Sequence, residues 1–173
     1  MRALGAGFLM VAVLFLYSGN ASAAEAGVGA MRLSSPEFEN NGLMPSKCTC
    51  DAQNINPALL IRGVPSSART LVLIVDGPDA PVGIWVHWVV FNIPVTRQIE
   101  ESSVPGIQGL NSFGRRDYGG PCPPSGTHRY FFKLYALDAK LSLSAKVSKE
   151  DLERTMQGHI LDTAELVGLY KRR

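Results

Sequence analysis

The sequence has 173 residues, a length that suits a single domain, and 18% of them are charged. Its formal net charge is only +2 at pH 7, which argues against a nucleic-acid-binding protein and against a polybasic membrane-binding protein. The sequence contains no internal repeat and no low-complexity tract.

The first 23 residues have the plan of a secretory signal peptide. Arg2 supplies a positive start, residues 3–17 form a nearly unbroken apolar run, and Ala21-Ser22-Ala23 offers a small-residue cleavage site. The run is shorter than the roughly 20 apolar residues of a transmembrane helix, and an uncleaved anchor is the alternative. We expect cleavage near Ala23, export to the periplasm or the cell exterior, and one mature domain over residues 24–173 without an integral membrane segment.

Residues 34–69 are rich in Asn, Pro, Ser and Gly and are expected to form loops and short edge strands. They contain Cys48 and Cys50, and Cys122 is the third cysteine. Export permits a disulfide, and Cys48 and Cys50 are too close in sequence to pair easily. A bridge from one of them to Cys122 therefore stays open, and three cysteines without a Cys-x-x-Cys pair do not predict a zinc site.

Two strands are predicted in the middle of the chain. Thr70–Val75 is β-branched and apolar, as in a strand buried on both faces. Residues 76–81 contain two prolines and a glycine and are expected to end it. The next strand is predicted over Ile84–Ile93. Strict alternation would place four of its residues on one face: Trp85, His87, Val89 and Phe91.

The C-terminal half begins with residues 94–127, which read as loop. His128–Leu137 predicts a third strand, with His128 and Tyr130 on one face. Ser148 is the expected N-cap of a short helix over Asp151–Gln157. For residues 163–171 periodicity alone favours a helix. Strands dominate without βαβ alternation, which indicates a mainly β fold with largely antiparallel sheets.

His87 and His128 are the residues most suggestive of a site. A single histidine beside aromatic residues on a strand more often has a structural role. Together, and next to rigid Pro/Gly loops, the two indicate the floor of a pocket that Tyr130 shares. Two imidazoles and a phenol offer donors that favour a compact anion. The backbone N–H groups of Gly119, Gly120 and Cys122 are expected to add further donors.

An enzyme is the least favoured alternative. Cys122 is near His128 in sequence, but a Cys–His pair also needs an orienting group and an oxyanion hole. His87, His128 and Asp79 are the candidate ligands of a catalytic metal. The Gly-x-Ser-x-Gly motif is absent. We therefore predict no catalytic residue, no bound metal and no cofactor.

The sequence resembles the phosphatidylethanolamine-binding proteins, specifically the bacterial and archaeal branch called Raf-kinase-inhibitor-like. Three long motifs carry the resemblance in order, at residues 76–81, 87–94 and 119–138. Shorter matches lie at residues 48–54 and 164–170. The resemblance covers nearly all of the mature chain.

The resemblance implies two antiparallel sheets with a few peripheral short helices, and it makes the tail at residues 163–171 a strand instead of a helix. It also implies a pocket at the strand ends for phosphate, phosphorylethanolamine or similar anions. The residues that match the family's pocket are His87, His128, Tyr130, Trp85, Asp79 and Pro81, with Gly120, Cys122 and Pro123 at the rim.

One position departs from the family motif. Gly77 stands where the family has the first aspartate of Asp-Pro-Asp-Ala-Pro, and Asp76 precedes it. Asp76 would point to the opposite side of a strand. The pocket should therefore lack one carboxylate and favour bare anions over zwitterions such as phosphorylethanolamine.

The favoured function is non-catalytic binding of a small anionic or phosphorylated ligand by an exported protein. The alternative is a protein-interaction module that inhibits a protease or kinase, as some relatives do, with the pocket receiving a charged side chain or a peptide terminus. Because relatives of this branch can be dimeric, a homodimer is also expected.

Overall fold

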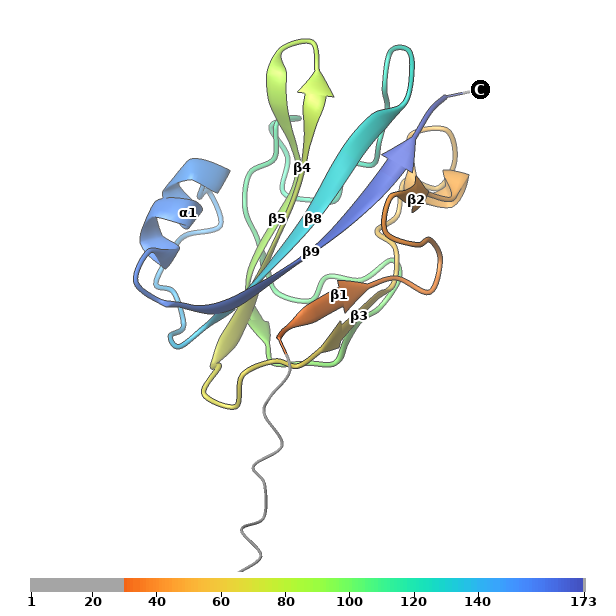
Figure 1. Ribbon diagram of the computed structural model, residues 1–173. Coiled ribbons are helices and arrows are strands. Elements are labelled where there is room, and N and C mark those ends of the chain that lie inside the picture. The colour runs from red at the N-terminus through yellow and green to blue at the C-terminus, as the bar shows by residue number, and fades with distance from the viewer. Residues whose placement is uncertain (1–29, 173) are drawn as a thin grey trace, which may run out of the picture.

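A computed structural model describes residues 30–172, so the predicted signal peptide lies outside the described residues. Two β-sheets pack face to face, with one α-helix at the side (Figure 1). The strands are β1 (Arg32–Ser34), β2 (Gly42–Leu43), β3 (Leu59–Arg62), β4 (Thr70–Ala80), β5 (Gly83–Pro94), β6 (Gln98–Ile99), β7 (Ile107–Gln108), β8 (His128–Leu137) and β9 (Ile160–Tyr170). The helices are α1 (Lys149–Met156) and the 3-10 turn η1 (Ser46–Cys48).

The larger sheet has the order β2-β9-β8-β4-β5-β7, and the smaller has the order β1-β3-β6. All pairs are antiparallel except β2 with β9. The predicted mainly β fold with largely antiparallel sheets is confirmed. The tail is the long strand β9, as the family resemblance implied and periodicity alone did not.

The core has two layers because β4 is buried on both faces, as its apolar run predicted. On one face, Leu73 and Val75 pack with Leu59 and Ile61 of the smaller sheet. On the other face, Val72 and Ile74 pack beneath α1, whose buried residues include Leu152 and Met156. The central strands are therefore held rigidly between the two layers.

Helix α1 begins at the predicted N-cap. The Ser148 hydroxyl accepts a hydrogen bond from the Asp151 backbone N–H at 3.2 Å. Leu152 and Met156, four residues apart, lie on the face that is buried against the sheet. Gly158, at φ +82°, follows the helix and turns the chain toward β9.

Strand β4 continues further than the sequence predicted. Residues 76–81 were expected to end it, but β4 extends to Ala80. Its pairing with β8 stops at Asp76, and beyond Gly77 the register with β5 is shifted as far as Ala80. Pro78 lies in this irregular stretch, where the missing N–H interrupts no ladder. The β4–β5 hairpin therefore projects beyond the sheet (Figure 1).

A β-bulge at His87 overturns the predicted alternation of β5. Val75 pairs with Trp88 and Asp76 pairs with Val86, which leaves His87 as an extra residue. His87 and Trp88 consequently face the same side, His87 against Tyr130 and Trp88 against Tyr118. Val89 and Phe91, predicted to share the His87 face, instead belong to the layer under α1.

Across residues 30–172, none of the helices reaches the length and apolarity of a membrane-spanning segment.

Candidate functional site

An open cavity of about 310 Å³ lies where the β4–β5 hairpin meets the loop before β8, at the upper end of the sheet in Figure 1. It is lined by residues from these strands and from two loops: Gly77, Ala80, Trp85, His87, Phe113, Cys122, Pro123, Pro124, His128, Arg129 and Tyr130. Six of the nine residues predicted from the sequence are among them. Asp79, Pro81 and Gly120 lie outside the lining.

His87 is the most constrained of these side chains. Its Nδ1 lies 2.6 Å from the carbonyl oxygen of Gly119, and the Gly119 backbone N–H donates to the His87 carbonyl at 3.0 Å. Since a carbonyl only accepts, Nδ1 carries the proton and the neutral ring has its lone pair on Nε2. Burial lowers the pKa of His87 below its ordinary 6.5, although the contact with Gly119 opposes this shift.

Tyr130 forms the wall beside His87. The two rings are 5.1 Å apart in an edge-to-face arrangement, and the tyrosine is almost fully buried. Burial raises the pKa of Tyr130 well above its ordinary value, and the charge of Asp79 adds to the effect. The phenol therefore keeps its proton and acts as a hydrogen-bond donor. His128, the first residue of β8, is half-buried on the same cavity.

Asp79 holds Arg129 in place instead of facing the cavity. Its Oδ2 accepts from Nε and from the backbone N–H of Arg129, each at 2.9 Å, and its Oδ1 accepts from the guanidinium at 2.6 Å. These bonds lower the pKa of Asp79 to about 2. The fork fixes the hairpin to the start of β8 and adds a cation to the cavity wall, which the sequence did not indicate.

The loop before β8 uses the backbone N–H groups of Gly119 and Gly120 for hydrogen bonds within the protein. The Gly119 N–H bonds His87, and the Gly120 N–H donates to Asn54 Oδ1 at 2.7 Å, so the prediction that both would face a ligand was wrong. Cys122 forms a disulfide with Cys50, which decides the pairing that the sequence left open. Cys122 therefore has no thiol to pair with His128, and Cys48 is the free, buried cysteine.

Gly77 lies at the floor of the cavity. A Cβ placed there would be 3.5 Å from Tyr130 Cδ1 and 3.6 Å from His87 Nε2. Asp76 faces the other side of the sheet, where it meets Lys133 and Lys149. The prediction that Asp76 points to the opposite side of the strand is therefore confirmed.

Phe113 is a wall residue that the sequence analysis did not find. Its ring lies 5.4 Å from that of Trp85 and 5.8 Å from that of His87. A Cβ at residue 119 would overlap the Phe113 ring, so Gly119 allows this close approach. The only signal in the sequence was a single aromatic residue in a glycine-rich loop.

Within the described part of the chain, no three His, Cys, Asp or Glu side chains are grouped so as to hold a metal ion. The candidate metal ligands from the sequence were His87, His128 and Asp79. The two histidines line the cavity, but Asp79 does not, because it is bound to Arg129.

Comparison with known proteins gives consistent results. The sequence model of the family described as phosphatidylethanolamine-binding protein matches residues 34–171. A UPF0098 protein of Methanothermobacter thermautotrophicus is 49% identical over 150 residues, which are 82% of this chain and 99% of the relative. One from Pyrococcus abyssi is 41% identical over 177 residues, covering 96% of this chain and 99% of the relative.

Two solved structures share the fold. The crystal structure of a phosphatidylethanolamine-binding protein homologue from Chlamydia trachomatis superposes with a TM-score of 0.81 at 42% identity, covering 83% of this chain and 99% of that one. YbcL of E. coli, described as a member of the mammalian family of such proteins, gives a TM-score of 0.76 at 27% identity, with coverage of 83% and 99%.

Proposed function

Because the chain belongs to the phosphatidylethanolamine-binding protein family, we propose that it is an exported, non-catalytic protein that binds a small phosphate-bearing or otherwise anionic ligand. The supporting observation is that His87 of β5 and His128 and Tyr130 of β8 line one open cavity together with Arg129. Imidazole, phenol and guanidinium groups are hydrogen-bond donors that suit phosphate oxygens.

The geometry suggests how each group acts. The contact of His87 Nδ1 with Gly119 leaves Nε2 for the ligand. In neutral His87 this atom accepts a hydrogen bond from a protonated phosphate, and in the charged ring it donates to a phosphate oxygen. Tyr130 donates its phenol proton to a phosphate oxygen, whereas Arg129, whose charge Asp79 already balances, only borders the cavity. Binding of this kind forms hydrogen bonds and leaves all covalent bonds unchanged.

Calorimetry with inorganic phosphate tests this function. We expect His87→Ala and His128→Ala each to weaken phosphate binding by about tenfold, because each removes a hydrogen bond to a charged ligand. His159→Ala is the matched control, since His159 lies outside the cavity and bonds Asp138 at 2.8 Å. Equal losses in all three variants, or no heat of phosphate binding in the wild type, would contradict the proposal.

Phosphate affinity should rise as the pH decreases from 8 toward 5, because protonated His87 gains a donor and a positive charge. Calorimetry across this range measures the change.

The stability of the ligand-free protein should instead fall as the pH decreases. Its folded-state pKa at His87 is lowered, so below the ordinary value of 6.5 the unfolded chain binds a proton first and stability falls. Thermal unfolding of wild type and His87→Gln across this range measures the difference. A His87→Gln profile parallel to that of the wild type would refute the assignment.

Gly77→Asp should reverse the ligand preference. The new carboxylate would lie beside Nε2 of His87, where it stabilises the protonated ring, repels bare phosphate and attracts an ammonium group. We expect phosphate to bind about tenfold more weakly and phosphorylethanolamine to gain relative to it. Gly77→Asn is the control that fills similar space without charge. Wild-type protein that prefers phosphorylethanolamine to phosphate would overturn this prediction.

One feature favours the second candidate, a protein target. Val82 and Ile84, at the projecting hairpin, are 76% and 58% exposed near the cavity mouth. Exposed apolar side chains beside a polar pocket suit a partner that inserts a charged group while covering the rim. The double substitution Val82→Ser/Ile84→Ser should weaken the binding of a protein partner without changing the affinity for phosphate.

A further inference from the structure

A second hollow, of about 790 Å³, lies beside β3 of the smaller sheet. It is formed by β3, by the turn that follows it and by the connection from β5 to β6. Its lining residues are Leu60, Ile61, Arg62, Gly63, Val64, Val95, Thr96, Arg97 and Gln98. The hollow adjoins the Thr70 and Pro94 ends of β4 and β5, whereas the histidine cavity adjoins Gly77 and Trp85. The two hollows are therefore near opposite ends of β4 and β5, the strands that run along the length of the molecule in Figure 1.

Two arginines line this hollow and a third lies beside one of them, although all three are distant in sequence. Arg62 and Arg97 line it, and Arg32 pairs directly with Arg62 across β1 and β3. The backbone of Arg97 joins the same sheet by accepting a hydrogen bond from the Ile61 N–H at 2.8 Å. All three side chains are exposed. Net charge did not reveal this cluster because acidic residues elsewhere balance it.

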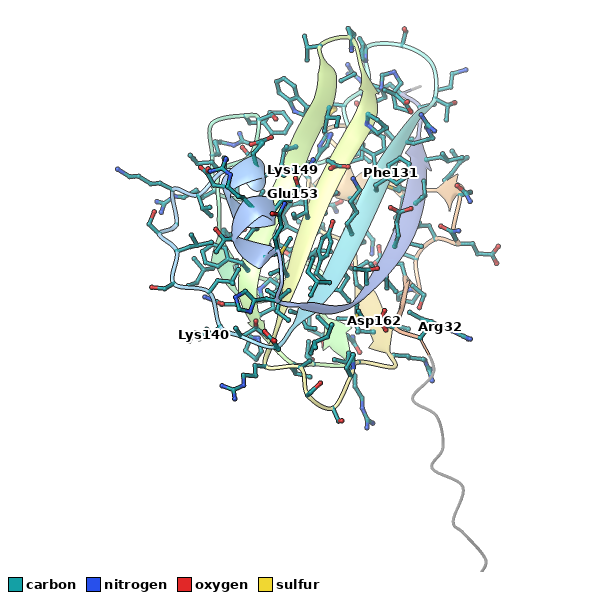
Figure 2. The ribbon with its side chains drawn as sticks, turned by 60° about the vertical axis from the view of Figure 1, so that its left-hand side comes forward. Arg32, Phe131, Lys140, Lys149, Glu153 and Asp162 are labelled. Carbon is teal, nitrogen blue, oxygen red and sulfur yellow. A yellow bond between two sulfur atoms is a disulfide. The ribbon has the colours of Figure 1, made fainter. Side chains whose placement is uncertain are left out.

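The arginine charges are not neutralised within the described chain. Among residues 30–172, no acidic group lies within ion-pair distance of Arg32, Arg62 or Arg97. Asp162, near Arg32 in Figure 2, instead accepts a hydrogen bond from the Met31 backbone N–H at 2.8 Å. Like charges directly opposite on neighbouring strands are destabilising, so an external anion would relieve the Arg32–Arg62 pair.

Apolar surface lies among these charges. Leu60 and Val64 are half-buried in the hollow, and Val95 is 47% exposed. No aromatic side chain lines the hollow, so it lacks the stacking surface that single-stranded nucleic acid uses. Cations around an exposed aliphatic side chain such as Val95 are a combination that adsorbs to the interface of an anionic bilayer.

We propose that this hollow is a docking surface for an anionic lipid bilayer. Phosphate-bearing headgroups would contact Arg32, Arg62 and Arg97, while the exposed side chain of Val95 meets the interfacial region. The arginines are spread over two strands and a connection, an arrangement that suits an array of headgroups better than one small anion. Docking here leaves the histidine cavity at the far end of the molecule and does not depend on its ligand.

Sedimentation with phosphatidylcholine vesicles, with and without phosphatidylglycerol, tests the proposal on residues 24–173. Wild-type protein should bind the anionic vesicles at least about tenfold more tightly than the neutral ones, and added salt should remove the difference. Arg62→Glu/Arg97→Glu should lose about tenfold or more in affinity. Arg116→Glu/Lys146→Glu is the matched control, because it makes the same charge change at exposed cations outside the hollow.

Thermal unfolding verifies that each variant folds. If Arg62→Glu/Arg97→Glu does not fold, Arg62→Gln/Arg97→Gln takes its place in the vesicle experiment. Equal losses in the control would show that net charge alone drives adsorption and would overturn the proposal. Equal binding to both kinds of vesicle would overturn it too. If vesicle binding is lost in His87→Ala and kept in the arginine variants, the headgroup binds in the histidine cavity and the proposal is overturned. Calorimetry with phosphate tests binding in the histidine cavity separately.

Discussion

Asp76→Ala should destabilise the protein by about 3 kcal/mol, measured as the free energy of unfolding in urea. The Asp76 carboxylate is 2% exposed and lies 2.9 Å from Lys133 Nζ and 3.2 Å from Lys149 Nζ. Lys149 is itself 9% exposed. Removing the carboxylate leaves this ammonium group buried, with Glu153 at 3.5 Å as its remaining partner.

The position of Lys149 explains the size of this effect. It is the first residue of α1 and points with Glu153 toward the sheet face that carries Phe131 (Figure 2). Burial lowers the pKa of Lys149, and Asp76 and Glu153 more than offset this, so the net shift is upward. The ion pair therefore keeps Lys149 charged while it connects α1 to β4.

A double-mutant cycle isolates the interaction. Asp76→Ala should cost much less in a Lys149→Met background, because no buried charge is then left without its partner. Arg154→Ala is the control on the same helix. Its exposed pair with Asp151 should contribute no more than about 0.5 kcal/mol. A cost below about 1 kcal/mol for Asp76→Ala would mean that solvent replaces the carboxylate.

Loss of the Cys50–Cys122 disulfide should cost about 4 kcal/mol, because the bridge spans 72 residues and restricts the unfolded chain. The comparison is between wild type and Cys50→Ser/Cys122→Ser under oxidising conditions. A reducing agent should lower the unfolding temperature of the wild type and leave the double variant unchanged.

The same change should weaken phosphate binding. The bridge fastens Cys122, a cavity wall residue, to a loop that is itself held by a 2.7 Å hydrogen bond from Tyr170 to Asp51. Without the bridge, the loop that carries Pro123 and Pro124 is held to this segment only by hydrogen bonds, from Cys50 N–H to Pro121 and from Gly120 N–H to Asn54. Cys48→Ala is the control, since that buried thiol forms no disulfide. Undiminished stability in the Cys50/Cys122 variant would show that the loop contacts suffice.

Alternation of apolar residues and helix capping correctly predicted β8 and the start of α1. The strand over His128–Leu137 has the predicted bounds, and His128 and Tyr130 share the predicted face. Ser148 is the N-cap that was expected. These elements follow from alternation and capping, which act over a few residues.

Long-range contacts decided the features that the sequence did not predict. The bulge at His87 depends on the register between β4 and β5. Asp79 was expected in the pocket because its motif matched, but Arg129, 50 residues away, binds it. Arg32, Arg62 and Arg97 converge only when β1, β3 and β6 form one sheet. Such contacts carry no periodic signal.

The bulge in β5 makes chain length there as important as residue identity. Deleting one residue between Trp85 and Trp88 would restore regular pleating and turn either the imidazole or the indole toward α1. A homologue with a one-residue gap at this point could retain both histidines in its sequence and still lack the cavity. Insertions and deletions in this strand therefore indicate more directly than substitutions which relatives share the cavity.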